Sequence, residues 1–106
     1  MNKILIEITV PHTDNKGKGL DLDTRKQVEK LILRNSGGFS RVTNVHGSWL
    51  DDSGKRYDDI NSIYRIIVDD NPSVIANIRH QALVLKQELN QECILFTTQE
   101  IKMEYI

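Results

Sequence analysis

The chain contains a single cysteine, Cys93, so it cannot form an intrachain disulfide, and nothing in it indicates an oxidising compartment. It has no run of about 18 apolar residues, the length that a membrane-spanning helix needs. Its N-terminal apolar run is also shorter than that of a signal peptide and has no cleavage site after it. We therefore expect a soluble cytoplasmic protein with no membrane segment.

A basic surplus is also missing, because 14 Lys and Arg residues stand against 15 Asp and Glu residues, a net charge of −1. Dedicated nucleic-acid binders usually carry an excess of positive charge. Aromatic residues make up only 6% of the chain, and the segment SIYRIIVDD lacks the aromatic pattern of RNA-recognition strands. Nucleic-acid binding is therefore the least favoured function, although locally segregated charge would still be compatible with it.

Metal-binding and nucleophile motifs are absent as well. His12, His46 and His80 form no paired spacing such as HxH or HxxxH, and Cys93 has no second cysteine to pair with in a metal site. Cys93 also opens an apolar segment, where we expect it to be a small buried hydrophobe rather than a nucleophile. We expect no metal and no resident cofactor.

The first half of the chain predicts a strand and a helix. Residues 3–10 place apolar side chains at every second position, which is typical of a strand with one buried face. A loop follows, and then a helix that Asp23 or Thr24 could cap, with Thr24 and Gln27 at the capping-box spacing. Gly37 and Gly38 are expected to end this helix.

The second half predicts a hairpin, a helix and a last strand. Residues 39–50 read as a strand in which Gly47 marks a bulge or a twist point, and the segment DDSGK as a turn before a third strand at residues 60–70. Asn71 and Pro72 are a strong start signal for a helix over residues 73–90. Residues 93–106 supply the final strand.

This order, β-α-β-β-α-β, predicts one α+β domain over residues 1–106 with the ferredoxin-like fold. In that fold a four-stranded antiparallel sheet carries both helices on one face. The other face stays open, and Tyr64, Leu5, Leu95 and Met103 are among the residues that could lie on it. Because a second copy could bury an apolar face, we expect a homo-oligomer, either a dimer or a trimer.

The loop at residues 15–19, NKGKG, is a weaker candidate for function. It lacks the GxxxxGK[ST] pattern of phosphate-binding loops, and Asp21 and Asp23 separate it from the helix. It is either a solvated loop or a cationic loop that folds over an anionic ligand held elsewhere.

The hairpin at residues 45–60 is the main candidate site. A turn accounts for Asp51 and Asp52, since Asp side chains bond their own backbone in turns. It does not account for Trp49 just before the turn, or for Tyr57 followed by the adjacent Asp58 and Asp59 just after it, because Asp is disfavoured in strands. Such a group could orient a cationic or hydroxyl-bearing ligand, and the alternative is a polar hairpin end with a tryptophan lid. We assign to the site the residues His46, Trp49, Tyr57, Asp58 and Asp59.

The layout GG-F…G-S-W-x-D-x-S-G…Y-D-D, with LNQECILF after the second helix, resembles small ferredoxin-like bacterial and phage families. These are the uncharacterised DUF3574 group and the phage S-adenosylmethionine (SAM) lyases. The lyase resemblance implies an oligomer that binds SAM between subunits, where the substrate's carboxylate attacks its own γ-carbon and expels methylthioadenosine. The family's acidic residue at the start of the third strand would fall on Asp59, or less well on Asp58. This sequence has Asp where those relatives tend to have Glu.

Two functions stay open. The first is small-molecule binding, or lyase-type chemistry on SAM or a nucleotide-like ligand, at a homo-oligomer interface with Asp59 as the catalytic residue. The alternative is a non-enzymatic interaction or inhibitor module of a phage or mobile element, which would bind another protein through its open sheet face.

Overall fold

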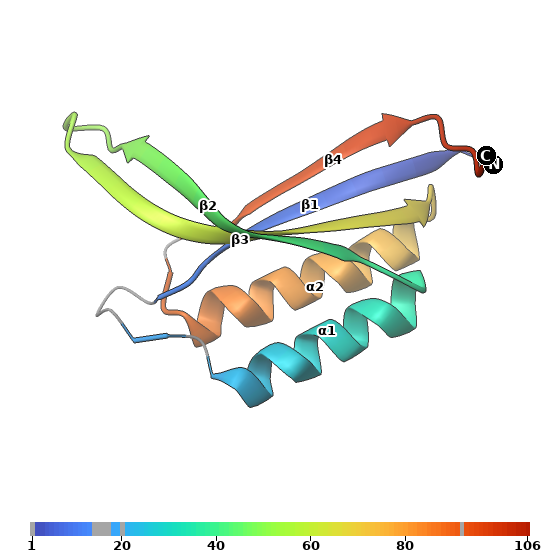
Figure 1. Cartoon of the computed structure of the whole chain (residues 1–106), viewed down its shortest axis with the longest axis horizontal. Helices are drawn as coiled ribbons and strands as arrows, with labels where there is room; N and C mark the ends of the chain where they lie inside the picture. The colour runs from blue at the N-terminus through green and yellow to red at the C-terminus, as the bar shows by residue number, and fades with distance from the viewer. Residues whose placement is uncertain (1, 14–17, 20, 92) are drawn as a thin grey trace.

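The computed structural model describes residues 2–13, 18–19, 21–91 and 93–106. It confirms the predicted order and the ferredoxin-like α+β fold: an antiparallel four-stranded sheet in the order β2-β3-β1-β4, with both helices on one face (Figure 1). The elements are β1 (Lys3–Pro11), α1 (Leu22–Ser36), β2 (Ser40–Leu50), β3 (Arg56–Asp69), α2 (Pro72–Glu88) and β4 (Leu95–Ile101). No helix in the described part of the chain is long and apolar enough to cross a membrane.

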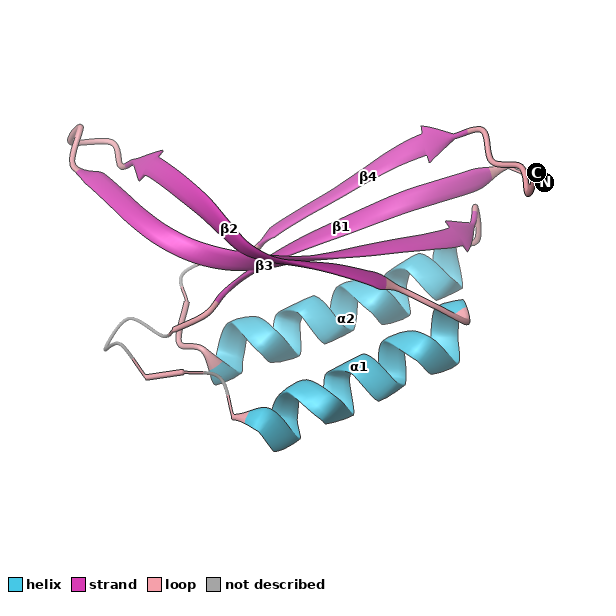
Figure 2. Cartoon of the chain, in the orientation of Figure 1, coloured by secondary structure: helices cyan, strands magenta, loops and turns pink. Residues whose placement is uncertain are grey.

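The core lies between the sheet and the two helices, which lie side by side beneath it (Figure 2). The period-two pattern of β1 directs Ile6 and Ile8 onto the helices, and both side chains are fully buried. Each such side chain stabilises the fold by roughly 1.5–3 kcal/mol. The helices contribute the buried residues Val28, Ile32, Ile78, Ala82 and Leu85.

The predicted start of the second helix is confirmed. Asn71 caps α2, since its side-chain oxygen accepts a hydrogen bond from the backbone N–H of Ser73 at 3.0 Å, and Pro72 is the first helical residue. Pro is well tolerated at that position because the first N–H of a helix has no partner within it.

The predicted start of the first helix is wrong by two to three residues. The cap is Asp21 rather than Asp23 or Thr24, because the Asp21 carbonyl already accepts from the N–H of Arg25 at 3.0 Å. Because the helix begins at Leu22, Thr24 lies inside it, and the Asp21 side chain makes no capping hydrogen bond. The predicted end at Gly37 is confirmed, with φ of 81°.

The sequence placed Tyr64 on the open face of the sheet, but this prediction is wrong. Tyr64 pairs with Ile8 in the register between β1 and β3, so it points toward the helices and is 1% exposed. Its hydroxyl donates a hydrogen bond to Glu29 Oε1 at 3.1 Å. Its ring packs edge-on against the ring of Phe39, with the two ring centroids 5.4 Å apart. Burial, helped by the negative charge of Glu29, raises the pKa of Tyr64 to about 12.

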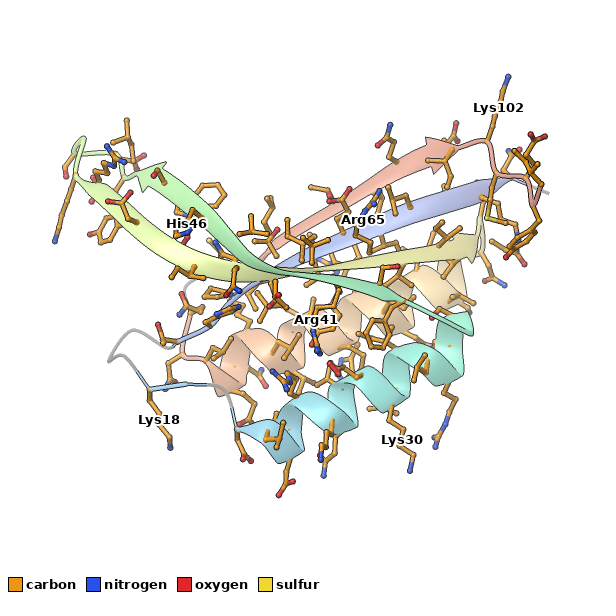
Figure 3. The ribbon with its side chains drawn as sticks, in the orientation of Figure 1. Lys18, Lys30, Arg41, His46, Arg65 and Lys102 are labelled. Carbon is orange, nitrogen blue, oxygen red and sulfur yellow. The ribbon has the colours of Figure 1, made fainter. Side chains whose placement is uncertain are left out.

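Arg41 completes this cluster from β2. Its guanidinium is paired with Glu29, and Figure 3 shows it on the helix side of the sheet. The neighbouring Tyr64 hydroxyl and the Glu29 carboxylate raise the pKa of Arg41 further above its usual range. The sequence pattern missed this link between β2 and α1.

Of the two features predicted for Gly47, a bulge or a twist point, the bulge is wrong. The register between β2 and β3 shifts between Val42 and Val45, where Asn44 has a φ of 59°. Asparagine adopts this left-handed conformation more readily than most residues. Gly47 itself pairs regularly with Asp59.

The lengths of the last strands differ from the prediction. β3 begins at Arg56, four residues before the predicted start, so the hairpin is longer than expected. β4 begins at Leu95, and Cys93 precedes it as an exposed residue rather than a buried one.

The open face is confirmed for Leu5 and Leu95. Leu5 alternates with the core residues of β1 and pairs with Ile67 of β3, while Leu95 pairs with Thr9. Ile67 is 41% exposed and Leu95 is 49% exposed, whereas Leu5 is only 8% exposed, so this face presents some apolar surface beside the Glu7–Arg65 pair. Met103 lies beyond the end of β4.

Candidate functional site

The hairpin of β2 and β3 forms an arm in which residues 45–50 pair with residues 56–61 (Figure 1). Its turn is the predicted one. The Asp51 carboxylate accepts from the N–H groups of Ser53 and Lys55, both at 2.9 Å, and Gly54 has a φ of 84°. The Ser53 hydroxyl first, and then the Lys55 N–H, hold the pKa of Asp51 below its ordinary value. Turn geometry therefore accounts for Asp51.

Asp59 is the centre of a hydrogen-bonded cluster on one face of the arm. The Trp49 indole N–H points at both carboxylate oxygens, with Nε1 3.1 Å from Oδ1 and 3.0 Å from Oδ2. The Asn61 side-chain amide donates to Asp59 Oδ1 at 2.7 Å and to the Val45 carbonyl at 3.3 Å. Asn61 is 2% exposed while Trp49 is 46% exposed, so the cluster runs from a buried anchor to an accessible aromatic ring.

Gly47 makes this cluster possible. It lies directly opposite Asp59, and a Cβ placed on it would come within 2.6 Å of Asp59 Oδ1 and 2.9 Å of Asn61 Nδ2. It would also lie 3.0 Å from Trp49 Nε1. A glycine inside a strand often marks such a close approach. The sequence signal at Gly47 was therefore real, but its cause is packing against Asp59 rather than a bulge.

Asp58 points to the opposite side of the arm, because neighbouring strand residues alternate between faces. Its carboxylate accepts from the Ser48 hydroxyl at 2.6 Å and from Arg56 Nε at 3.0 Å. The Ser48 hydrogen bond, followed by Arg56, lowers the pKa of Asp58 below its ordinary value. The two adjacent aspartates thus belong to separate clusters.

The other predicted site residues divide in the same way. His46 pairs with Ile60 in the register, which places it on the side of Asp58. Tyr57 pairs with Trp49 and shares its face, with the Lys55 ammonium 5.0 Å from the ring centroid. The structure therefore brings Trp49, Tyr57 and Asp59 to one face and leaves His46 and Asp58 on the other. Among the described residues, no group of His, Cys, Asp and Glu could hold a metal ion.

The face that carries Asp59 continues into the open face of the sheet. Along β3, Tyr57, Asp59 and Asn61 alternate onto the same side as Ile63 and Ile67. A carboxylate and two half-exposed aromatic rings thus lie on the same side of the sheet as the open face, which carries apolar residues together with the Glu7–Arg65 ion pair. We call this surface, defined by Trp49, Tyr57, Asp59, Ile67 and Leu95, the open-face site.

Asn61 is the member of this cluster that sequence reasoning missed. It lies in a strand pattern between Ile60 and Ser62, where an amide reads as an ordinary polar position. The available signal was its i, i+2 spacing from Asp59, which places both side chains on one face of a strand.

Neither a protein-family model nor a curated protein sequence matches the chain. Among solved structures, CutA1 from Oryza sativa is similar with a TM-score of 0.68 and 14% identity, covering 99% of this chain and 84% of that one. A phage SAM lyase in complex with S-methyl-5′-thioadenosine gives a TM-score of 0.67 and 16% identity, covering 92% and 81%. The Bacillus subtilis GlnK–ATP complex gives 0.63 and 13%, covering 94% and 82%.

At these identities the likeness shows a shared fold and no more. It includes the phage SAM lyases that the sequence resembles, while the resemblance to the DUF3574 group still depends on the sequence segments alone.

Proposed function

We propose that the protein binds an adenosine-type small molecule at the open-face site, where copies of the chain meet. The main observation in support is the cluster of Trp49, Asp59 and Asn61 around Gly47, which holds a carboxylate beside an exposed indole. In its enzymatic form this function is the cleavage of SAM, with Asp59 as the residue that orients the substrate.

The chemistry of the cluster suits such a ligand. An exposed indole provides a flat surface on which an adenine ring can stack, and aromatic faces attract cations such as a sulfonium. A carboxylate has about four acceptor positions. Trp49 and Asn61 occupy part of this capacity in Asp59, so the group is held in place and can still accept a hydrogen bond from a ligand.

Cleavage of SAM by its own carboxylate would need little from the protein beyond orientation. The carboxylate oxygen forms a bond to the γ-carbon while the carbon–sulfur bond breaks, and the electron pair of that bond neutralises the sulfonium. No proton has to be moved, so positioning and the exclusion of water are the main requirements. A site without a general acid or base is consistent with this reaction.

A homo-oligomer would supply the exclusion of water. In one copy, Trp49 and Tyr57 are 46% and 47% exposed and Ile67 and Leu95 are also accessible. A second or third copy packed against the open face would cover these groups and close the site. The phage SAM lyase and GlnK structures, with their adenosine-containing ligands, add support for the ligand class. A cytoplasmic location and a phage origin stay predictions.

Calorimetric titration with SAM, S-methyl-5′-thioadenosine and ATP tests the proposal on three proteins: wild type, Asp59→Asn and Asp58→Asn. The two variants remove the same charge at adjacent positions on opposite faces. Loss of a charge-assisted hydrogen bond costs roughly 1.5–3 kcal/mol, so Asp59→Asn should weaken binding about ten- to hundredfold while Asp58→Asn leaves it unchanged. Equal effects of both variants, or no binding by the wild type, would refute the proposal.

The second candidate function is a non-enzymatic module that binds another protein through the open face. The exposure of Val42, Ile67 and Leu95 favours it, because a different protein could bury these apolar side chains as well as a second copy of this chain could. A monomeric protein whose melting temperature does not change with any of the three ligands would support this alternative.

A further inference from the structure

A cavity of about 260 Å³ lies on the helix side of the sheet, where the end of β1 approaches the first turn of α1. The side chains of Ser62 and Tyr64 line it from β3. His12 and Arg25 line it from the chain segments on either side of the loop that joins β1 to α1. None of the described lining residues is acidic.

Arg25 is the informative residue of this cavity. Its Nε atom is buried and has no hydrogen-bond partner. Guanidinium groups stay protonated in proteins, so this is a buried donor on a cation without an acceptor, an arrangement that costs stability. A ligand oxygen could supply the missing partner.

His12 and Ser62 add further polar groups at the same place. His12 Nε2 lies 2.9 Å from the Ser62 hydroxyl oxygen, and both residues line the cavity together with Thr43. A hydroxyl can rotate to donate to a bound oxygen atom. The cavity thus combines an arginine with hydroxyl groups and an imidazole.

We propose that this cavity binds a small oxyanion, the phosphate or carboxylate group of a metabolite, with the Arg25 guanidinium as its principal partner. A volume of about 260 Å³ accommodates such a group with part of its parent molecule, but it lies below the roughly 300–1,000 Å³ of sites for drug-sized ligands. The site is separate from the open-face site, because Ser62 and Tyr64 alternate onto the helix side of β3 and Asp59 onto the other side. It does not depend on the proposed function.

Inorganic phosphate and malonate are the probes for this site, added at constant ionic strength to protein in a buffer free of other oxyanions. We expect the melting temperature to rise with the concentration of at least one probe. The Nε–Hε signal of Arg25 in a ¹H–¹⁵N NMR spectrum should shift in the same titration. The probe that acts at the lower concentration distinguishes a phosphate site from a carboxylate site.

Arg25→Gln is the test variant and Arg34→Gln the matched control, since Arg34 is an exposed arginine in the last turn of the same helix. Arg25→Gln should bind the probes at least tenfold more weakly. Without any probe it should melt at the same temperature as the wild type or higher, because an unpaired buried donor has been removed. Arg34→Gln should behave like the wild type in both respects.

Arg25→Lys is a second variant in case Arg25→Gln does not fold. It keeps the positive charge, so it should still bind the probes, although more weakly than the wild type. The proposal is overturned if neither probe shifts the Arg25 Nε–Hε signal of the wild type at millimolar concentration. It is also overturned if Arg25→Gln and Arg34→Gln lose the same amount of binding, since the effect would then be one of general charge.

Discussion

Gly47 and Asp59 lie opposite each other in β2 and β3, and a Cβ on Gly47 would come within 2.6 Å of the Asp59 carboxylate. The cluster around Asp59 therefore depends on the absence of a side chain on the neighbouring strand. This relationship ties the fold of the hairpin arm to the proposed ligand site.

Gly47→Ala should displace Asp59 and expose Trp49 further, because the new methyl group overlaps the position of the carboxylate. Trp49 is the only tryptophan, so its fluorescence spectrum reports the change directly. We expect a changed emission spectrum and a loss of about 1–3 kcal/mol in the free energy of unfolding, the usual cost of overpacking.

Gly38→Ala is the control for that variant, since a Cβ on Gly38 would meet nothing within 4 Å. It should leave both the fluorescence and the stability close to those of the wild type. If the two alanine variants behave identically, a Cβ at position 47 does not clash with Asp59, and the cluster does not require a glycine there.

Tyr64→Phe should change how stability depends on alkaline pH. The pKa of Tyr64 is raised to about 12 in the folded protein from an ordinary value of 10.0. A raised pKa gives stability that is complete below pH 10 and is lost as the pH rises to about 12, here about 2–3 kcal/mol. Denaturant unfolding between pH 9 and 12 should show this loss in the wild type, and Tyr64→Phe should lose less. Parallel pH profiles for the two proteins would contradict this assignment.

Asn71→Ala should destabilise the protein by about 0.5–2 kcal/mol, the usual cost of removing a helix cap. Asn71 accepts from the Ser73 N–H, whereas the Asp21 side chain makes no such hydrogen bond at the start of α1. Asp21→Ala should therefore cost less in a thermal melt, although both residues occupy the same position at the start of a helix. A larger loss for Asp21→Ala would mean that the caps have been assigned the wrong way round.

Gln81→Met should raise the free energy of unfolding by about 1 kcal/mol, because the Gln81 side-chain oxygen is buried without a hydrogen-bond partner. Methionine has a similar length and no oxygen to satisfy. Gln87→Met, at an exposed position of the same helix, should have almost no effect on a denaturant titration. Destabilisation by Gln81→Met would indicate that the amide does have a partner.

The sequence predicted the strands and helices well where local pattern decides them. The alternation in β1 and the Asn71-Pro72 signal gave the correct elements, because burial on one face and cap chemistry act within a few residues. Tyr64 was assigned to the wrong face because the face it occupies depends on the register between β1 and β3, in which it pairs with Ile8. The partners that bury it, Glu29 and Phe39, are distant in the sequence.

The candidate site was only partly predictable for a similar reason. Trp49, Tyr57 and Asp59 could be found as unusual residues at a strand end, but which of the two aspartates shares a face with Trp49 depends on the strand register. That register is set after an irregularity in β2 at Asn44, and no pattern in the neighbouring residues predicts this irregularity. The loop at residues 15–19 lies mostly outside the described residues, so both interpretations of it stay predictions.

The central claim is that an adenosine-type ligand binds at the open-face site where copies of this chain meet. Native mass spectrometry of the wild type with S-methyl-5′-thioadenosine measures both parts of the claim in one spectrum. We predict a dimer or trimer that carries bound ligand, and no ligand on Asp59→Asn at the same concentrations. A monomer without ligand, or an oligomer whose ligand is kept by Asp59→Asn, would contradict the account.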